Sequence, residues 1–250
     1  MTKLISPYPN VTVYANKTGK IIARHKPGPN PKIKTHPQYE NTRRNMAVLG
    51  KAASAGKLIR YLFNEPLHSI SDPLVSGRLT GRLHPMFRSG INENYGPGCA
   101  AGDISPLEGF SFNARAGIYE CFLEPWSLSL ENNNKRVGIS IPPIIPTRSI
   151  RNPNGGCACY RLVPYIAAID FTAPDYKLVK PEPAEPVRHN DQTSKEITLT
   201  ADIGRPGNWL VLIALGIEFY WCGPNNQFCP VAGGTHNALT ITNTFTTCVS

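Results

Sequence analysis

The stretch "GKAASAGKL" (residues 50–58) has the residue types of a phosphate-binding loop. A Walker A loop has four residues between its first glycine and its Gly-Lys pair, and then Ser or Thr, because backbone N–H groups surround the phosphates and the hydroxyl binds Mg²⁺. Here five residues separate Gly50 from Gly56, and Leu58 follows Lys57. The preceding "YENTRRNMAVL" is polar and then helical, where a nucleotide-binding loop would follow a hydrophobic strand. The spacing therefore argues against a nucleotide site.

Histidines and cysteines form no recognisable metal-binding motif. None of the six histidines pairs with another at ligand spacing on an expected helix, and the pairs Cys157/Cys159 and Cys222/Cys229 match no zinc ribbon or finger. A zinc site built from both pairs is one alternative, and buried thiols are the simpler one. Cys222 and Cys229 flank an expected turn, so they would be the pair to oxidise outside the cytoplasm. We expect no metal and no cofactor.

The sequence also lacks the familiar catalytic motifs. The sequence contains no Gly-x-Ser-x-Gly elbow and no His-Glu-x-x-His. The acids with the most hydrophobic neighbours are Asp170 in "IAAIDF" and Glu218 in "LGIEFYW". Burial raises the pKa of a carboxyl group and can suit it to acid–base catalysis, but buried acids are more often paired structurally. The sequence therefore favours a protein that is not an enzyme.

Composition favours a mainly β fold with a small helical part. Of the 250 residues 41% are hydrophobic, enough to build the core of one large domain or two smaller ones. The 24 prolines and 21 glycines, with a charged fraction of only 17%, are typical of short strands joined by ordered loops. We expect an antiparallel β-sandwich preceded by an N-terminal β-hairpin arm and two helices.

Charge is distributed unevenly along the chain. Residues 1–100 carry 15 Lys and Arg against 4 Asp and Glu, whereas residues 101–250 carry 11 against 13. The first part suits an anionic partner, which could be nucleic acid, a membrane surface or the acidic face of another protein. A solvated basic surface is the alternative.

Targeting signals are not recognisable. The N-terminus has no apolar run behind a basic start, and no apolar stretch reaches the 18 or so residues of a transmembrane helix. We expect synthesis in the cytoplasm and no transmembrane segment. The sequence leaves the final location open, and release into an extracellular assembly is one option.

Residues 1–37 are expected to form a basic extended arm with a β-hairpin. The turn contains Gly19, and the two strands of "VTVYANKTGKIIARH" place hydrophobic residues at Val11, Val13, Ile21 and Ile22. A lone hairpin is barely stable in water, so it needs a surface to pair with, in its own domain or in a neighbour. The proline-rich stretch 26–38 fits an extended connector that is not helical throughout.

Residues 38–108 are expected to form a helical region and a long loop. After an N-cap at Asn41 or Thr42, one hydrophobic stripe recurs at spacings of three and four. Its members are Met46, Leu49, Ala53, Gly56, Ile59 and Phe63. The small residues between Gly50 and Gly56 would let another backbone approach closely, although each glycine costs about 1 kcal/mol of helix propensity. A second short helix is expected to start near Asp72 or Pro73 and to end before Pro85, with residues 89–109 as a loop.

Basic side chains surround the rest of the first helix. They are Arg43, Arg44, Lys51, Lys57 and Arg60. These residues are candidate contacts for the phosphates of a nucleic acid, and a solvated helix face is the alternative.

Residues 109–250 are expected to form the sandwich, because the hydrophobic period changes to two. The alternating sets are Trp126-Leu128-Leu130, Val137-Ile139-Ile141, Ile197-Leu199-Ala201 and Leu239-Ile241. Residues 159–171 predict one or two strands interrupted by Pro164. Residues 209–221 are apolar on nearly both faces and predict a central strand covered on each side. Roughly seven or eight strands in all are expected.

Four motifs follow one another between residues 10 and 115. They are "VTVYANKTGKIIAR", "TRRN…GKAASAGKLIR", "SGRLTGRL" and "LEGFSFN". In this order they resemble a group of uncharacterised Bacteroidota proteins, in which a hairpin, an "AGKLIR" helix, an "RLT" helix and a "GFxFN" segment precede a β-rich half. The resemblance brings no activity and no site residue with it. It implies that "GKAASAGKL" belongs to a recurring helix motif.

These observations favour a non-enzymatic structural subunit that self-assembles into a filament, tube or shell through its basic arm, with other copies of itself as partners. The expected subunit-interface residues are Val11, Val13, Tyr14, Ile21, Ile22, Arg24, Leu49, Gly50, Ala53 and Gly56. One alternative is a nucleic-acid-associated protein that uses the arm without sequence preference. Another is a carbohydrate-directed enzyme or binder on the sandwich.

Overall fold

The computed structural model describes the chain except for residues 1–2, 5–10, 16–17, 26–30, 90–103, 133–134, 153–157, 171–174, 183, 204–208, 224–226 and 248–250. Two compact units divide the chain, Met1–Ala47 and Val48–Ser250. The predicted regions 1–37, 38–108 and 109–250 are grouped differently here, because most of the helical region shares one unit with the sandwich.

The first unit contains the predicted hairpin, which is confirmed. Strands β2 (Val11–Ala15) and β3 (Ile21–His25) pair antiparallel, and β1 (Lys3–Leu4) pairs with the other edge of β2. Gly19 in the turn has a φ of 79°, a left-handed conformation that glycine adopts without strain. Part of the expected connector is helical instead, in α1 (Lys32–Thr35) and the 3₁₀ helix η1 (Pro37–Tyr39). Pro37 occupies the first turn of η1, where a missing N–H costs no bond.

Helix α2 (Glu40–Leu62) buries a face that is rotated from the predicted one. Its buried residues are Val48, Ala52, Ala55, Gly56, Ile59 and Leu62. The expected members Met46 and Leu49 are 60% and 50% exposed. The prediction was wrong here because the alanines on both sides of the helix make two stripes nearly equivalent in sequence. Gly56 and Ile59 belong to both the predicted and the observed face, and Gly56 packs closely on Leu83, since a Cβ on it would stand only 3.3 Å from the Cδ1 atom of that residue.

Two further helices follow, α3 (Asn64–Leu67) and α4 (Val75–Ser89). The second runs through Pro85, so the predicted end before that proline is wrong. Pro85 cannot bond to the carbonyl of Gly81, four residues earlier. Both residues are exposed, and no atom lies within 4 Å of the position a Cβ on Gly81 would take. The unmade bond therefore lies on the solvent side of the helix.

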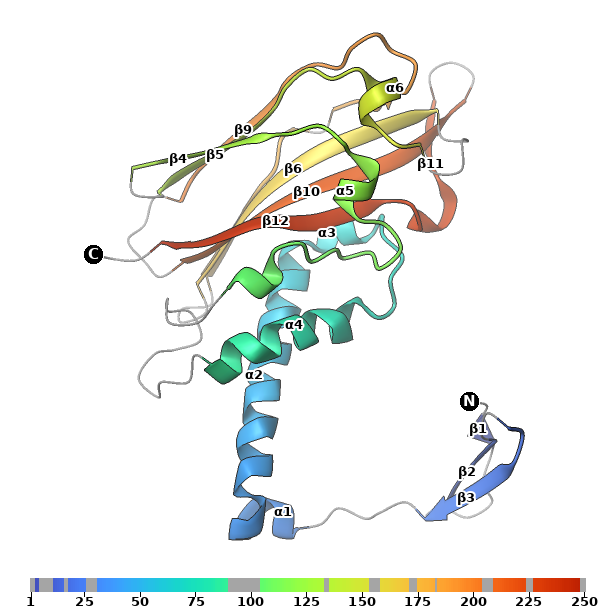
Figure 1. The fold of residues 1–250 in the computed structure, drawn as a ribbon, viewed down its shortest axis with the longest axis vertical. Helices are drawn as coiled ribbons and strands as arrows, with labels where there is room; N and C mark the ends of the chain where they lie inside the picture. Colours follow the sequence, from blue (N-terminus) through green and yellow to red (C-terminus); the bar gives the residue numbers. More distant parts are fainter. Residues whose placement is uncertain are drawn as a thin grey trace. The chain divides into compact units, whose positions relative to one another are not determined.

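Two antiparallel sheets form the sandwich of the second unit (Figure 1). The larger sheet has the order β11-β10-β6-β7, with β12 also paired to β10 and β8 to β6. Its strands are β6 (Cys159–Asp170), β7 (Asp175–Val179), β8 (Val187–Arg188), β10 (Trp209–Cys222), β11 (Phe228–Pro230) and β12 (Ala238–Thr247). The smaller sheet contains β4 (Ser127–Glu131), β5 (Arg136–Ile141) and β9 (Ile197–Asp202).

Strand β6 is continuous, so the predicted interruption at Pro164 is wrong. Pro164 lies opposite Leu215 of β10. On the other edge of β6, β8 pairs with residues 159–160 and β7 with residues 166–170. No described strand pairs with that edge at Pro164, so the missing N–H removes no bond from the sheet.

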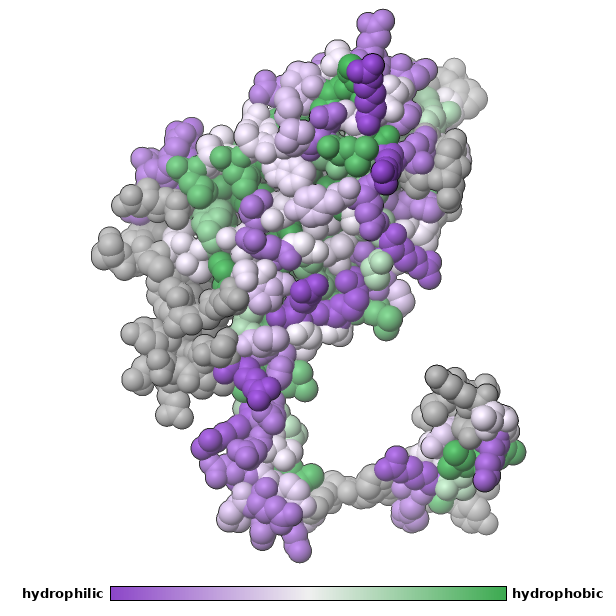
Figure 2. Space-filling model, in the orientation of Figure 1, coloured by the Kyte–Doolittle hydropathy of each residue, from purple (hydrophilic) through white to green (hydrophobic). Residues whose placement is uncertain are grey.

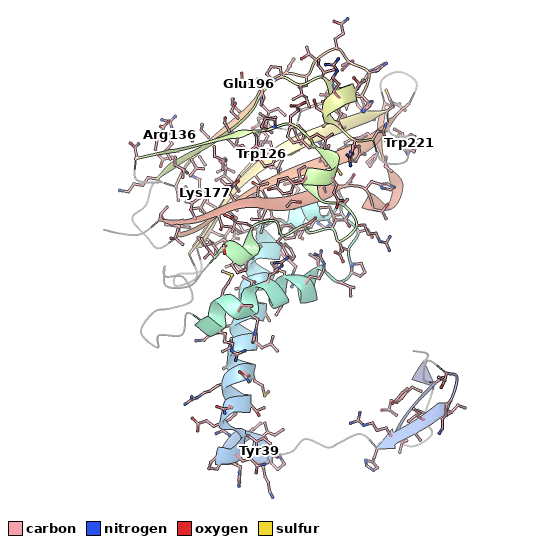
Figure 3. All side chains as sticks on the ribbon, viewed as in Figure 1. Tyr39, Trp126, Arg136, Lys177, Glu196 and Trp221 are labelled. Carbon is pink, nitrogen blue, oxygen red and sulfur yellow. The ribbon has the colours of Figure 1, made fainter. Side chains whose placement is uncertain are left out.

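Strand β10 is buried on both faces, as predicted. Leu210, Leu212 and Ala214 pack with the helices in one hydrophobic cluster. Val211 and Ile213 alternate with them and pack against Val137, Ile139 and other residues of the smaller sheet. Side chains fill the space between the sheets (Figure 3). The layers are therefore helices, the larger sheet and the smaller sheet, which confirms a mainly β, antiparallel β-sandwich preceded by a hairpin and helices.

Short helices complete the second unit. They are η2 (Ser105–Leu107), α5 (Ile118–Cys121), α6 (Pro146–Ser149) and η5 (Ala232–Gly234). Helix α5 packs over the odd-numbered residues Leu215, Ile217 and Phe219 at the far end of β10.

Asp72 fixes the start of α4, close to the predicted position. Its side chain, 6% exposed, accepts hydrogen bonds from the N–H of Leu74 at 2.8 Å and of Ala114 at 2.9 Å, and it pairs with the Arg78 guanidinium. Burial raises the pKa of Asp72, but these three donors outweigh it and hold the pKa below the ordinary 3.8. One carboxylate thus joins the helix to the segment around residue 114.

We predict that Asp72→Asn lowers the free energy of unfolding by about 2 kcal/mol at neutral pH, because charged hydrogen bonds are lost and Arg78 keeps an uncompensated charge. The depressed pKa means that this stability is present above the unfolded pKa and is lost as pH falls through the folded one. Chemical denaturation of both proteins should therefore show a difference that closes below about pH 4. A difference that is constant from pH 7 to pH 3 would contradict the role of the Asp72 charge.

We also predict that Gly234→Ala destabilises the protein. Gly234 has a φ of 56°, and a Cβ on it would stand 2.2 Å from the Ser69 carbonyl oxygen. The left-handed conformation alone costs about 1–2 kcal/mol with a side chain, so we expect thermal unfolding at least roughly 2 °C lower.

The matched control is Gly77→Ala on α4, where no atom lies within 4 Å of the added Cβ. Alanine should raise helix stability there by about 0.5–1 kcal/mol. Equal melting temperatures for the two variants would show that the close approach at Gly234 is not a constraint.

Candidate functional site

The hairpin presents one hydrophobic face. Paired residues share a face, and Val11, Val13 and Ala15 lie opposite His25, Ala23 and Ile21. The second face carries Tyr14 opposite Ile22 and Thr12 opposite Arg24. Every described residue of β2 and β3 is half-buried or exposed, and Ile21 is 65% exposed. Figure 2 shows hydrophobic residues on the surface of this hairpin.

Helix α2 carries the rest of the predicted interface. Leu49, Gly50 and Ala53 are all exposed, and no atom lies within 4 Å of the position a Cβ on Gly50 would take. Together with Met46 they form a stripe, because residues three and four apart share a helix face. Gly56 differs, because it is buried against Leu79 and Leu83 of the same chain. The stripe available to another molecule is therefore Met46, Leu49, Gly50 and Ala53.

The candidate anion contacts on α2 are not equivalent. Arg43 donates to the carbonyl oxygens of Ile33 and His36, and Arg44 pairs with Glu40 at 2.7 Å. Lys51 and Lys57 are exposed, and Arg60 is half-buried. The first two side chains thus already serve the local structure.

Glu218 is paired structurally, the simpler of the two roles considered for it. It accepts hydrogen bonds from Arg161 at 2.6 Å and from the Tyr220 hydroxyl at 2.7 Å. Burial raises the pKa of Glu218, but Tyr220 and Arg161 outweigh it and hold the pKa below its ordinary value. A carboxylate that stays ionised in this way does not suit a general acid. The Asp170 side chain lies outside the described residues.

The cysteines Cys222 and Cys229 are not placed for a disulfide. Cys229 lies opposite Trp221 and Cys222 opposite Phe228, so the two thiols occupy different faces of the sheet. Cys159 neighbours Cys222, and burial with that thiol raises the pKa of Cys159 to about 11. Cys157 lies outside the described residues. Among the described residues no group of three or more His, Cys, Asp or Glu is placed to hold a metal.

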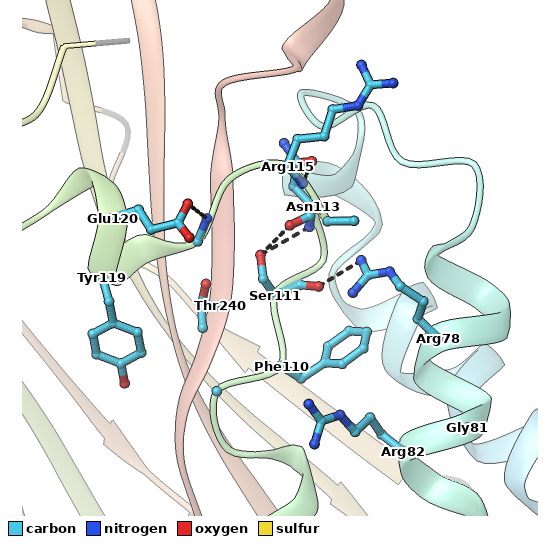
Figure 4. A pocket seen from close by; sticks show the side chains of 13 residues that line it. Arg78, Gly81, Arg82, Phe110, Ser111, Asn113, Arg115, Tyr119, Glu120 and Thr240 are labelled. Atoms are coloured by element: carbon cyan, nitrogen blue, oxygen red, sulfur yellow. Dashed lines mark hydrogen bonds between the residues drawn. The ribbon is translucent and has the colours of Figure 1, made fainter.

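A pocket that sequence analysis missed lies between α4 and the segment 109–120. Its volume is about 710 Å³. It is lined by Arg78, Gly81, Arg82, Gly109, Phe110, Ser111, Asn113, Ala114, Arg115, Gly117, Tyr119, Glu120 and Thr240. Figure 4 shows Arg78 and Arg82 extending from α4 toward Phe110, whereas the Arg115 side chain, beyond Asn113, is directed away from them. The sequence signal was the spacing of Arg78 and Arg82 in "SGRLTGRL", which places both on one helix face.

The wall of this pocket is fixed to the sheet. Gly109 and Phe112 donate their N–H groups to Ile241 and Leu239 of β12, each at 2.8 Å. The Asn113 side chain donates to the Asn237 carbonyl oxygen at 2.8 Å. Gly109 has a φ of 74°, which allows the chain to turn into this edge pairing. The wall is thus held before any ligand arrives.

The charged groups of the pocket fall into two classes. Arg78 is engaged, because it pairs with Asp72, donates to the Ser111 carbonyl oxygen at 2.9 Å and lies 5.1 Å above the Phe110 ring. The guanidinium groups of Arg82 and Arg115 have no hydrogen-bond or ion-pair partner among the described residues. Glu120 is the one lining carboxylate, and it accepts from the Gly117 N–H at 3.4 Å. The pocket is therefore cationic.

An aromatic ring borders the same pocket. Tyr119 is 53% exposed, and its ring lies 5.7 Å from that of Trp126, which also stacks on Phe122. Burial and the negative charge of Glu108 raise the pKa of Tyr119, so its hydroxyl remains a hydrogen-bond donor.

Within the described part of the chain, the helices are too short or too polar to cross a bilayer. Comparisons with known protein families, with curated proteins and with solved structures find no match.

Proposed function

We propose that this protein is a structural subunit that assembles with copies of itself through the hairpin (residues 11–25) and the exposed stripe of α2. The observation that carries the proposal is the lack of any buried residue in the described parts of β2 and β3. A sheet of two five-residue strands and a two-residue strand buries too little surface to be stable alone in water. It becomes stable when another surface covers its hydrophobic face.

Open strand edges supply a means of contact. In the described part of the chain, β3 has β2 on one side and no strand on the other, and β4 likewise has only β5. Unpaired edges are templates for pairing with another chain. An edge-to-edge contact between β3 of one copy and β4 of the next would pair both of these open edges.

Charge favours a second copy as the occupant. Residues 1–100 are strongly basic, whereas residues 101–250 carry a small excess of acids. Arg24 lies on β3, and β4 ends at Glu131, an exposed acid that is 4.0 Å from Arg136 of β5. Because the two surfaces differ, the contact is heterologous and repeats until a ring closes or a filament grows.

The exposed stripe on α2 adds a hydrophobic component. Met46 and Leu49 expose much of their surface, and Gly50 and Ala53 leave room for a neighbouring backbone. Burial of such a stripe contributes roughly 25 cal/mol for each Å² of apolar surface. This contribution would favour assembly over the free chain.

We predict that Val13→Asp prevents assembly of the full chain, because it places a charge in the hydrophobic face of the hairpin. Sedimentation velocity of the nuclease-treated protein should show large species for the unchanged chain and monomers for the variant.

The matched control is Thr12→Asn, which adds a polar side chain of the same size as aspartate one residue away on the opposite face and leaves the charge of Arg24 unchanged. It should assemble like the unchanged chain. Assembly of Val13→Asp to the same extent would refute the hairpin contact. Large species that disappear with nuclease would instead favour a nucleic-acid partner for the basic residues.

A further inference from the structure

The geometry points to a second, separate function for the pocket between α4 and residues 109–120: we propose that it binds the phosphate group of a small molecule that also carries a planar ring. This proposal does not depend on assembly. It rests on the charge, the shape and the rigidity of the pocket.

Two unpartnered guanidinium groups supply the binding chemistry. Arg82 and Arg115 line the pocket without an ion-pair or hydrogen-bond partner in the described structure, while Arg78 adds a third positive charge that Asp72 balances. The planar fork of arginine donates parallel hydrogen bonds to phosphate oxygens. Glu120 carries one negative charge and accepts from the Gly117 N–H, so it balances one of the two arginines that have no partner.

A neutral donor also belongs to the pocket lining. Burial and the charge of Glu108 keep the Tyr119 hydroxyl protonated. A hydroxyl donor suits an acceptor-rich ligand, since a phosphate group offers only acceptors at its ionised oxygens.

An aromatic surface favours a ring in the ligand. Tyr119 exposes its ring at the pocket, and Trp126 supports that ring at 5.7 Å between centroids. Stacking of a planar base or similar ring on an aromatic side chain contributes about 1–3 kcal/mol. Phosphate alone would leave this surface unused.

The size of the pocket matches such a ligand. Its volume of about 710 Å³ lies within the range of roughly 300–1,000 Å³ that small-molecule sites occupy. The hydrogen bonds of Gly109, Phe112 and Asn113 hold one wall on β12, so little ordering is needed when a ligand binds. A nucleoside monophosphate is the simplest probe that combines the phosphate and the ring.

The test is calorimetric titration of the full chain with adenosine monophosphate, ribose 5-phosphate, inorganic phosphate, adenosine and citrate. We expect the monophosphate to bind most tightly and adenosine to bind at least about tenfold more weakly, because charged hydrogen bonds are lost. Citrate binding tighter than adenosine monophosphate would overturn the assignment of a phosphate ligand.

The variant Arg82→Gln/Arg115→Gln should weaken adenosine monophosphate binding about tenfold or more. Neither arginine has a partner to lose, so the melting temperature should stay unchanged. The control Arg148→Gln removes an exposed arginine on α6, away from the pocket lining, and should bind like the unchanged chain. No binding by any phosphate probe, or equal binding by the double variant, would overturn the proposal.

Discussion

The rest of the structure depends on the burial of β10 on both faces. A strand with Leu210, Leu212 and Ala214 on one face and Val211 and Ile213 on the other cannot be satisfied by a single covering layer. The helices cover the first face, and the smaller sheet covers the second (Figure 1). The larger sheet is therefore the middle layer, and the order of the layers follows from this one strand. Glu218 is the acid within β10, and it is tolerated because Arg161 and Tyr220 satisfy it.

The same arrangement creates the pocket. The segment 109–113 follows the outer edge of β12 by hydrogen bonding, and α4 is joined to the adjoining loop by Asp72. Arginines on one face of α4 then stand above a wall that the sheet holds in place. The pocket is thus a consequence of how the helical layer ends at an edge of the sheet.

Much of the fold could be predicted from the sequence, because its strongest patterns are local. The hairpin around Gly19 and the doubly buried β10 follow from short-range periodicity and turn residues. The burial of Gly56 and Ile59 in α2 could be predicted, but that of Ala52 and Ala55 instead of Ala53 could not, since alanines occur on both sides of the helix. Whether Pro85 and Pro164 interrupt their helix and strand also depends on what lies beside each residue in space. At Pro164 no described strand pairs with the outer edge of β6, and at Pro85 the lost helix bond lies on the exposed side of α4, so neither proline ends its element.

The candidate sites, like the fold, could be predicted from the sequence only where the pattern is local. The hydrophobic residues of the hairpin, which we propose as an interface, are visible in sequence because a two-residue period is local. The pocket is not, because Arg82 and Arg115 are far apart along the chain and line one pocket only after α4 and the 109–120 segment are both in place. Even so, the spacing of Arg78 and Arg82 indicates the side of the pocket that α4 provides. Two basic residues four positions apart on a helix indicate a candidate anion site, since their charges repel each other unless an anionic group is near.

The most direct measurement is electron microscopy of the purified, nuclease-treated full chain, followed by averaging of any ordered particles. The account predicts filaments, tubes or shells in which the hairpin of one copy contacts the sandwich of the next. Dispersed single copies at all protein concentrations would contradict the proposal that this chain is an assembling subunit.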